Sequence, residues 1–264
     1  VSRRSTDILA EVRKLAESGV QEVVLLGQNV NSYGLNANGE PNFAQLVRRV
    51  AAVDGIRRIR FTTSHPKDMS DDLIACFADV AKLCGHIHLP VQSGSDAILE
   101  RMNRGYTRGE YLEKIRAIRR ARPGISVTGD IIVGFPGETE ADFEQTVSLV
   151  EDVRYSDLFL FVYSQRPGTK AAELPDELNR EQKVARLEML LEKQKQITRT
   201  INSSFLDTIQ AVLVEGEGKR AGQVSGRMDN GRIVNFTGQT DLIGNFVDIR
   251  IVKAYQNSLL GGLI

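Results

Sequence analysis

The stretch ISVTGDIIVG, at positions 125–134, is apolar at most positions and ends in a glycine. Such a run is typical of a parallel β-strand that is buried on both faces. Similar runs recur through residues 20–164 about every 30–40 residues, which is the length of one strand–helix unit. They are VQEVVLLG (Val20–Gly27), RIRFTTS (Arg58–Ser64), HIHLPVQSG (His86–Gly94) and SDLFLFVYS (Ser156–Ser164).

Amphipathic stretches separate these runs and predict helices. Repeated strand–helix units predict an α/β fold with a parallel sheet, either open and doubly wound or closed as a barrel. The chain opens on a helical pattern, so we expect an upstream strand that this chain lacks. The predicted helices are Thr6–Ser18, Phe43–Val53, Asp71–Leu83, Tyr111–Arg122, Thr139–Val153 and a long polar helix over Asn179–Phe205.

The pattern changes after residue 205 to short alternating segments divided by glycines. This pattern predicts an antiparallel β-barrel of about 60 residues, so we expect one domain over 1–205 and a second over 206–264. Small barrels of this kind often bind single-stranded nucleic acid by stacking and by backbone contacts. The exposed candidates for RNA contacts are Lys219, Arg220, Arg227, Asn230, Arg232, Asn235 and Phe236.

The composition sets limits on the class of protein. The chain has 264 residues, with 34 Lys and Arg against 34 Asp and Glu, so bulk charge does not favour nucleic acid. Basic residues are nevertheless concentrated in Arg101–Arg122 and Arg180–Arg199, which predict either solvated helix faces or phosphate contacts. No apolar run approaches the ~20 residues of a membrane span, and we expect no membrane partner. Two cysteines exclude a disulfide scaffold and favour a cytoplasmic protein.

Polar residues follow the predicted strands at the ends where parallel α/β folds bind ligands. A turn or a cap explains any one of these groups, but their repetition at equivalent strand ends favours a ligand. Asp130 lies inside an apolar strand, where a carboxylate must be paired or functional. The strand-end candidates are Gln28, Asn29, Asn31 and Ser32, then Ser64 and His65, then Gln92 and Ser93, and finally the Gly134–Glu138 segment.

His86 and His88 lie two positions apart, so they share one face of a strand. They could bind a metal, but no third ligand is evident and an internally satisfied pair is favoured. Cys76 and Cys84 are eight positions apart, and we expect them to be small buried hydrophobic residues rather than cluster ligands.

Several motifs together resemble one family, the radical S-adenosylmethionine methylthiotransferases. The tail from Gly226 to Leu263 resembles the TRAM barrel of the same family, an RNA-binding module. Within the family, the strand-end motifs are most similar to those of the members that modify tRNA. The motifs are, in order, LLGQNVNSYG, RFTTSHP, HLPVQSGSD, MNRGYTR, GDIIVGFPGET and YSQRPGT.

The resemblance implies a partial (β/α) barrel, with the first strand missing, that binds S-adenosylmethionine across its strand ends. It implies two [4Fe–4S] clusters in the full-length enzyme, one on a CxxxCxxC loop and one in an N-terminal domain that supplies sulfur. It implies a methylthio transfer to C2 of a modified adenosine next to the tRNA anticodon. The loop there exposes its bases for reading.

The resemblance also assigns the strand-end residues to the cofactor. Gln28 and Asn29 would contact the methionine amino group, and Ser64 and His65 the ribose or the carboxylate. Gln92 and Ser93 would face the cofactor, and Arg104 could pair with a carboxylate. Asp130 and the Gly134–Glu138 segment would lie near the adenine.

The chain departs from the family pattern because it contains no CxxxCxxC. We therefore expect a portion of such an enzyme that is inactive by itself, and the donor of the sulfur is not identified. Three alternatives remain: an RNA-binding protein on a degenerate barrel, a methylthiotransferase for another tRNA base or a ribosomal protein, and a metal-dependent hydrolase that uses His65, His86 and His88.

Overall fold

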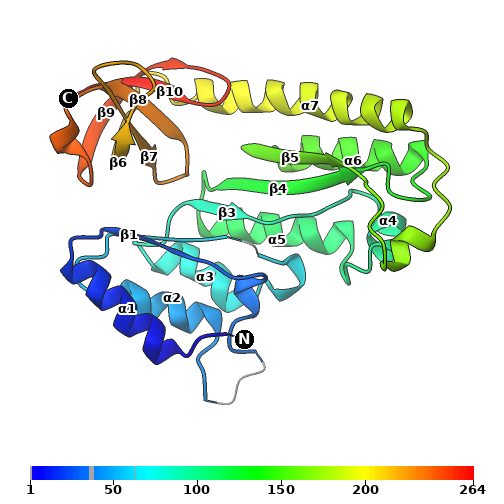
Figure 1. Ribbon diagram of the computed structural model, residues 1–264, viewed down its shortest axis with the longest axis horizontal. Coiled ribbons are helices and arrows are strands. Elements are labelled where there is room, and N and C mark those ends of the chain that lie inside the picture. The colour runs from blue at the N-terminus through cyan, green and yellow to red at the C-terminus, as the bar shows by residue number, and fades with distance from the viewer. Residues whose placement is uncertain (1, 36–38, 63) are drawn as a thin grey trace.

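The structure is a computed structural model that describes residues 2–35, 39–62 and 64–264. The first domain is an arc of parallel strands with helices packed on its outer side (Figure 1). β1 (Glu22–Leu25) pairs with β2 (Arg58–Phe61), and β4 (Ser126–Val133) lies between β3 (His86–His88) and β5 (Asp157–Val162). A parallel bridge between Ile59 and Leu83 joins the two groups of strands.

The helices begin where the sequence provides caps. Asn42, Thr107, Thr139 and Asn179 each form a capping box with the residue three positions later. The short helix α4 was not predicted, because six residues are too few for a periodic signal. None of the helices in the described residues is long and apolar enough to cross a membrane. The helices are α1 (Ser5–Glu17), α2 (Phe43–Ala51), α3 (Asp71–Asp79), α4 (Asp96–Arg101), α5 (Arg108–Ala121), α6 (Glu140–Val153) and α7 (Arg180–Ser203), with 3₁₀ turns at Val30–Ser32, Pro66–Asp68, Lys170–Glu173 and Thr240–Leu242.

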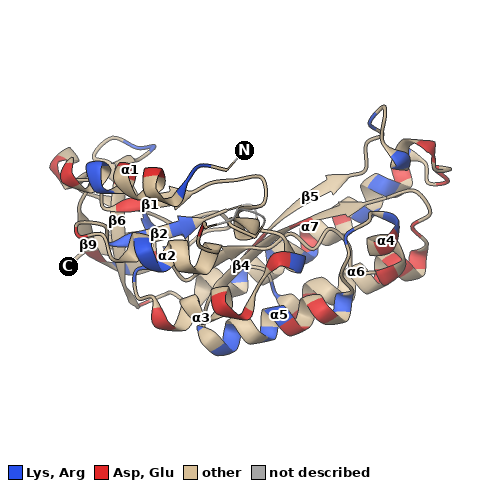
Figure 2. Cartoon of the chain, turned by 90° about the horizontal axis from the view of Figure 1, so that it is seen from below, with Lys and Arg blue, Asp and Glu red and all other residues tan. Residues whose placement is uncertain are grey.

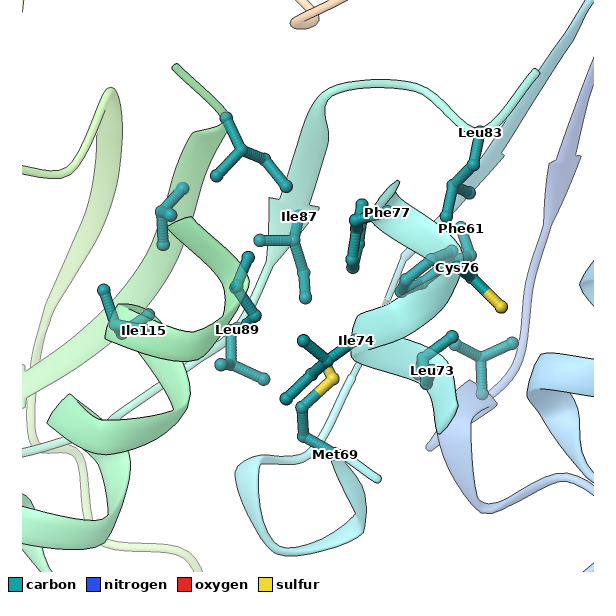
Figure 3. Close-up of a cluster of buried hydrophobic side chains, with 14 of the residues drawn as sticks. Phe61, Met69, Leu73, Ile74, Cys76, Phe77, Leu83, Ile87, Leu89 and Ile115 are labelled. Carbon is teal, nitrogen blue, oxygen red and sulfur yellow. The ribbon is translucent and has the colours of Figure 1, made fainter. Parts of the chain in front are cut away.

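The core of the first domain lies between the strands and the helices. Phe61 and Ile87 from the strands meet Phe77 of α3 and Ile115 of α5, and all are at most 2% exposed (Figure 3). Cys76 is part of this cluster. Cys76 and Cys84 are buried, which confirms their predicted role, and burial raises the pKa of their thiols to about 11 and about 12.

The second domain is a closed barrel with its own core. Its strands follow the order β10-β8-β7-β6-β9 around the barrel. β8 and β10 run parallel, so the prediction of an entirely antiparallel barrel is wrong for this pair. The reason is that the chain crosses to β9 before it returns beside β8. The strands are β6 (Ile209–Glu217), β7 (Gln223–Met228), β8 (Ile233–Thr237), β9 (Phe246–Ala254) and β10 (Leu259–Leu263).

The second domain lies against the N-terminal ends of the parallel strands. The Arg58 guanidinium donates to the backbone oxygens of Arg227 and Ala211, both at 2.8 Å. Arg60 donates to the backbone oxygens of Asp229 (2.9 Å) and Met228 (2.8 Å), and its Nε lies 2.9 Å from Oε1 of Glu22. Strand β2 is therefore joined to the second domain by buried, charge-assisted hydrogen bonds.

Candidate functional site

A row of hydrogen-bonding side chains lines the inner, concave face of the strands. Thr128 Oγ1 lies 3.2 Å from Nε2 of His86 and 3.0 Å from Nδ1 of His88. Nε2 of His88 lies 3.5 Å from Oδ1 of Asp130. The two histidines are thus satisfied within the strands, as predicted. Burial, reinforced by the charge of Arg60, lowers the pKa of His86 to about 3.

A cavity of about 420 Å³ lies between this row and the second domain. Thr128, Asp157 and Phe159 line it from the strands, and Arg227 and Asn230 line it from the second domain. Three of the predicted RNA-binding residues, Arg227, Asn230 and Arg232, therefore face the first domain. Cavities of this size can hold a small ligand.

The ends of β1 and β2 are held together by asparagines. Nδ2 of Asn31 donates to the backbone oxygen of His65, and Oδ1 of Asn31 accepts from the backbone NH of His65, both at 2.9 Å. Nδ2 of Asn29 lies 2.5 Å from Oδ2 of Asp68. Oδ1 of Asn29 and Oγ of Ser64 are buried, yet neither has a hydrogen-bond partner among the described residues. Gln28 is exposed beside them.

An unpaired cation lies beside the same strand ends. Arg104 lies over the Tyr106 ring at 5.8 Å, and its Nε donates to the Tyr106 hydroxyl at 3.3 Å. No carboxylate pairs with Arg104 in the described part of the chain. The His65 ring packs edge-on against Tyr106 at 5.6 Å. Burial, together with the nearby Arg104 charge, lowers the pKa of His65, so this imidazole is neutral at neutral pH.

Backbone strain marks the segment that follows β3. Gln92 has a φ of 74°, which is uncommon for a residue with a side chain and costs about 1–3 kcal/mol. Its backbone NH donates to the Asp130 oxygen, and its own oxygen accepts from Ile132, both at 2.9 Å. Such strain is concentrated at binding sites.

Ser93 does not face the open strand ends, contrary to expectation. It is 1% exposed, and its hydroxyl accepts from the backbone NH of Ser95 and lies 3.4 Å from Oγ1 of Thr146. The reason is the following Gly94, where an added Cβ would lie 2.5 Å from Cα of Thr146. This close approach of α6 turns Ser93 into a packing contact.

The Gly134–Glu138 segment is fixed in place by its own carboxylate. Oε1 of Glu138 accepts from the Gly134 backbone NH at 3.1 Å and pairs with Arg186 of α7 at 2.5 Å. Burial raises the pKa of Glu138 despite this cation. Glu138 immediately precedes the α6 cap, Thr139, so its role in the described structure is to attach this loop to α7.

The predicted RNA-binding residues of the second domain divide into two groups. Lys219 and Arg220 are exposed and Asn235 is partly exposed, whereas Arg227 pairs with Glu215 at 3.0 Å. The predicted exposure of Phe236 and Arg232 is wrong. Phe236 is 0% exposed because it fills the barrel core. Arg232 is buried because it donates to the Ser156 backbone oxygen of the first domain.

The basic runs of the helices form no single positive face. Along α5, Glu110 and Glu113 lie among the basic residues of the first half of the helix (Figure 2). Arg108 pairs with Asp152 at 2.9 Å, and Arg186 pairs with Glu138 and Glu140. These runs therefore serve mainly as solvated or ion-paired helix faces.

The strand ends fit S-adenosylmethionine but not an iron–sulfur cluster. The unpaired guanidinium of Arg104 suits a carboxylate, and the unpartnered oxygens of Asn29 and Ser64 suit amino or hydroxyl donors. A cluster needs thiolates, and the two cysteines are buried thiols. The described residues also contain no group of three His, Cys, Asp or Glu side chains that could hold a metal, so the hydrolase alternative lacks a ligand set.

Sequence reasoning missed Tyr106, which contacts both His65 and Arg104. Its hydroxyl also donates to the Val91 backbone oxygen at 2.8 Å and so attaches its loop to the end of β3. An aromatic residue directly after Gly105, just before the predicted helix Tyr111–Arg122, was the available signal.

Comparison with known families identifies both domains. Residues 2–150 match the radical SAM superfamily, and residues 206–264 match the TRAM domain. The chain therefore belongs to the radical SAM superfamily, and it carries a TRAM domain at its C-terminal end. The predicted fold, a partial radical-SAM barrel followed by a small barrel, is confirmed.

Individual relatives of high sequence identity show which members of the superfamily this chain is similar to. The chain is 66% identical over 264 residues to the tRNA-2-methylthio-N(6)-dimethylallyladenosine synthase of Pelobacter propionicus. It is 63% identical to the protein of that name from Trichlorobacter lovleyi and 61% identical to that from Geobacter sulfurreducens, each over 264 residues. All of this chain is covered in each case, and the chain spans about 60% of the length of these curated relatives.

A solved structure supports the fold alone. Coproporphyrinogen III oxidase from Escherichia coli, a radical SAM enzyme, superposes with a TM-score of 0.54 at 13% sequence identity. The match covers 87% of this chain and 62% of that one.

Proposed function

We propose that this chain is the cofactor-binding barrel and the RNA-binding domain of a tRNA methylthiotransferase. The enzyme would add a methylthio group to C2 of dimethylallyladenosine next to the anticodon, in the cytoplasm. The observation that carries this proposal is the 66% identity, over every residue of the chain, to a synthase of that product.

The strand-end residues would hold the cofactor. Arg104 would pair with the methionine carboxylate, and Asn29 and Ser64 would accept hydrogen bonds from its amino group and from the ribose. Gln28, His65 and Gln92 would border the same end of the sheet, and Asp130 and the Gly134–Glu138 loop would lie near the adenine. When bound, S-adenosylmethionine supplies the methyl group and the radical chemistry that activates C2.

This chain's own residues would bind and orient the substrates. His65 is neutral, so it adds no positive charge next to Arg104 and leaves that guanidinium as the anchor for a carboxylate. Lys219, Arg220 and Asn235 would contact the tRNA backbone. The two [4Fe–4S] clusters would be held by the part of the relatives that this chain does not span.

The proposal can be tested with a hybrid enzyme. The remaining part of the Pelobacter propionicus synthase is joined to this chain, the clusters are reconstituted, and the methylthio nucleoside is quantified by mass spectrometry. We expect product, and we expect Arg104→Gln to reduce its rate about 100-fold, because the charge that would orient the cofactor carboxylate is lost. A hybrid that holds its clusters and yields no product would contradict the proposal.

A further inference from the structure

Two phenylalanines on β5 are exposed although they lie within a folded sheet. Phe159 is 51% exposed and Phe161 is 53% exposed, while Leu158 of the same strand is buried in the core of the first domain. No other phenylalanine among the described residues is exposed. Side chains alternate between the two faces of a strand, so Leu158, Leu160 and Val162 of β5 pack toward the core. Phe159 and Phe161 lie on the opposite face and contribute little to the core.

Both phenylalanines face the concave side, next to the polar row. In the register of the sheet, Phe159 pairs with Asp130 and Phe161 pairs with Ile132. The Phe159 ring packs edge-on against His88 at 6.1 Å, and Phe159 also lines the 420 Å³ cavity. Phe159, Phe161 and Ile132 thus form one apolar wall, which we call the β5 wall, beside the hydrogen-bonding groups of His88 and Asp130.

The β5 wall is large and apolar, and free volume lies beside it. Exposed apolar side chains gathered at one place mark binding surfaces more often than ordinary surface. An occupant must therefore combine an apolar group with a polar, hydrogen-bonding part that meets the polar lining of the cavity, such as Asp157 and Asn230. A dimethylallyl-adenine has this form, because a branched five-carbon group is attached to a base with polar edges.

We propose that the β5 wall receives the dimethylallyl group of the target nucleoside and makes the site selective for the prenylated base. This inference rests on the proposed function, since the relatives' name supplies the nucleoside. Phe159 and Phe161 are specificity-determining residues, and the polar lining of the cavity lies where it meets the edge of the same base.

The test compares two anticodon stem-loop RNAs that differ only in the dimethylallyl group on the adenosine. Their affinities for this chain are measured by fluorescence anisotropy at one fixed salt concentration, with S-adenosylmethionine present. We expect the prenylated RNA to bind at least about 10-fold more tightly, as is usual for added apolar groups in a fitted pocket. In the variant Phe159→Ala/Phe161→Ala, we expect the preference to fall below about 2-fold, with the affinity for unmodified RNA unchanged.

Two further variants keep the result interpretable. Phe161→Leu retains an apolar side chain and should retain part of the preference. Met189→Ala removes a side chain on α7 that is also 53% exposed, and it should leave the preference intact. A circular dichroism melt verifies that each variant is folded.

Each outcome decides between the two proposals. If the unchanged chain binds both RNAs equally, or if the double variant keeps the preference, the inference about the β5 wall is overturned and the proposed function stands. If the double variant loses affinity for S-adenosylmethionine and keeps its RNA preference, the wall holds the cofactor instead. If the chain binds neither RNA, the proposed function itself loses its support.

Discussion

The two ends of the same parallel strands are built in opposite ways. At the N-terminal ends, Arg58 and Arg60 donate to four backbone oxygens of the TRAM domain. One oxygen there, Oε2 of Glu22, has no hydrogen bond but lies 3.9 Å from the Arg58 guanidinium, so its charge is paired. At the C-terminal ends, Asn29 and Ser64 carry buried oxygens without partners, and Arg104 has no carboxylate partner among the described residues.

The difference indicates which end stabilises the protein and which end is suited to the ligand that we propose. A buried polar atom without a partner costs about 1–3 kcal/mol, because its hydrogen bonds to water are not replaced. Folding alone would select against such atoms, whereas a ligand that supplies the missing partners benefits from them. Mutations at the two ends should therefore have opposite effects on stability and binding.

The largest effect is expected at the closed end. Arg60→Ala would leave Glu22, whose side chain is 11% exposed, with only a longer contact of 3.9 Å to Arg58, and it would remove one donor from each of the Asp229 and Met228 backbone oxygens. We expect the free energy of unfolding to fall by about 3–5 kcal/mol, as for other broken buried ion pairs. Urea denaturation followed by circular dichroism measures this change.

A matched arginine on the surface serves as the control. Like Arg60, Arg48 forms several hydrogen bonds, in this case with the carboxylates of Asp72 and Asp79. Its side chain, however, is 35% exposed. Arg48→Ala should cost less than about 1 kcal/mol, because water screens the pairs and replaces them. Equal losses for Arg60→Ala and Arg48→Ala would show that the closed end is no more stabilising than the surface.

An intermediate effect is expected from His86, which lies toward the closed end. In the unfolded chain His86 gains a proton below its ordinary pKa of 6.5, whereas in the folded protein it remains neutral down to about 3. Between these values the unfolded state binds more protons, so stability is fully present above 6.5 and declines as the pH falls toward 3. The free energy of unfolding should fall between about pH 7 and about pH 4. We expect this fall to be about 2 kcal/mol smaller in His86→Gln than in the unchanged chain.

This prediction depends on the slope of stability with pH and not on the stability itself. The carboxyl groups titrate equally in both proteins, so the difference between the two urea-denaturation series isolates the imidazole. Parallel curves for His86→Gln and the unchanged chain would contradict the assigned burial of this group.

The smallest effect, and one of opposite sign, is expected at the open end. Ser64→Ala removes a buried hydroxyl that has no partner among the described residues. We expect it to raise the free energy of unfolding by about 0.5–1 kcal/mol while it weakens S-adenosylmethionine binding about 5-fold. Thermal denaturation and isothermal titration calorimetry measure the two changes.

Ser70→Ala provides the contrast for this substitution. Oγ of Ser70 accepts from the Leu73 backbone NH at 3.2 Å and caps α3, so its loss should lower stability by about 1 kcal/mol. Cofactor affinity should stay the same. A loss of stability in Ser64→Ala comparable to that in Ser70→Ala would mean that the Ser64 hydroxyl is paired after all.

The sequence predicted the fold well wherever a local rule decides it. The strand-like runs and the long helices appear at the predicted places, because burial on both faces and capping residues such as Thr107 and Thr139 leave local signals. Differences arise where tertiary contacts decide. β3 ends at His88 rather than Gly94, since Pro90 has no NH to continue the ladder.

The candidate site was predicted less completely. The clusters after β1 and β2 were recognisable because amide and hydroxyl side chains repeat at equivalent strand ends. The inward turn of Ser93 depends on how closely α6 approaches Gly94, which no local pattern encodes. Phe236 and Arg232 were expected at the surface because their exposure depends on barrel closure and on contact with the first domain, and both are long-range.

The bonds between β2 and the TRAM domain would have a consequence for RNA binding by the proposed enzyme. Domains joined by a flexible linker lose orientational freedom when one ligand contacts both, and that loss weakens binding. Here Arg58 and Arg60 of the first domain donate hydrogen bonds to backbone oxygens of the TRAM domain and fix the orientation of the two domains. The orientational entropy of the domains is therefore lost during folding and not during RNA association. An RNA bound through Lys219 and Arg220 would therefore meet the barrel in a single orientation, and the TRAM domain would act as a rigid template.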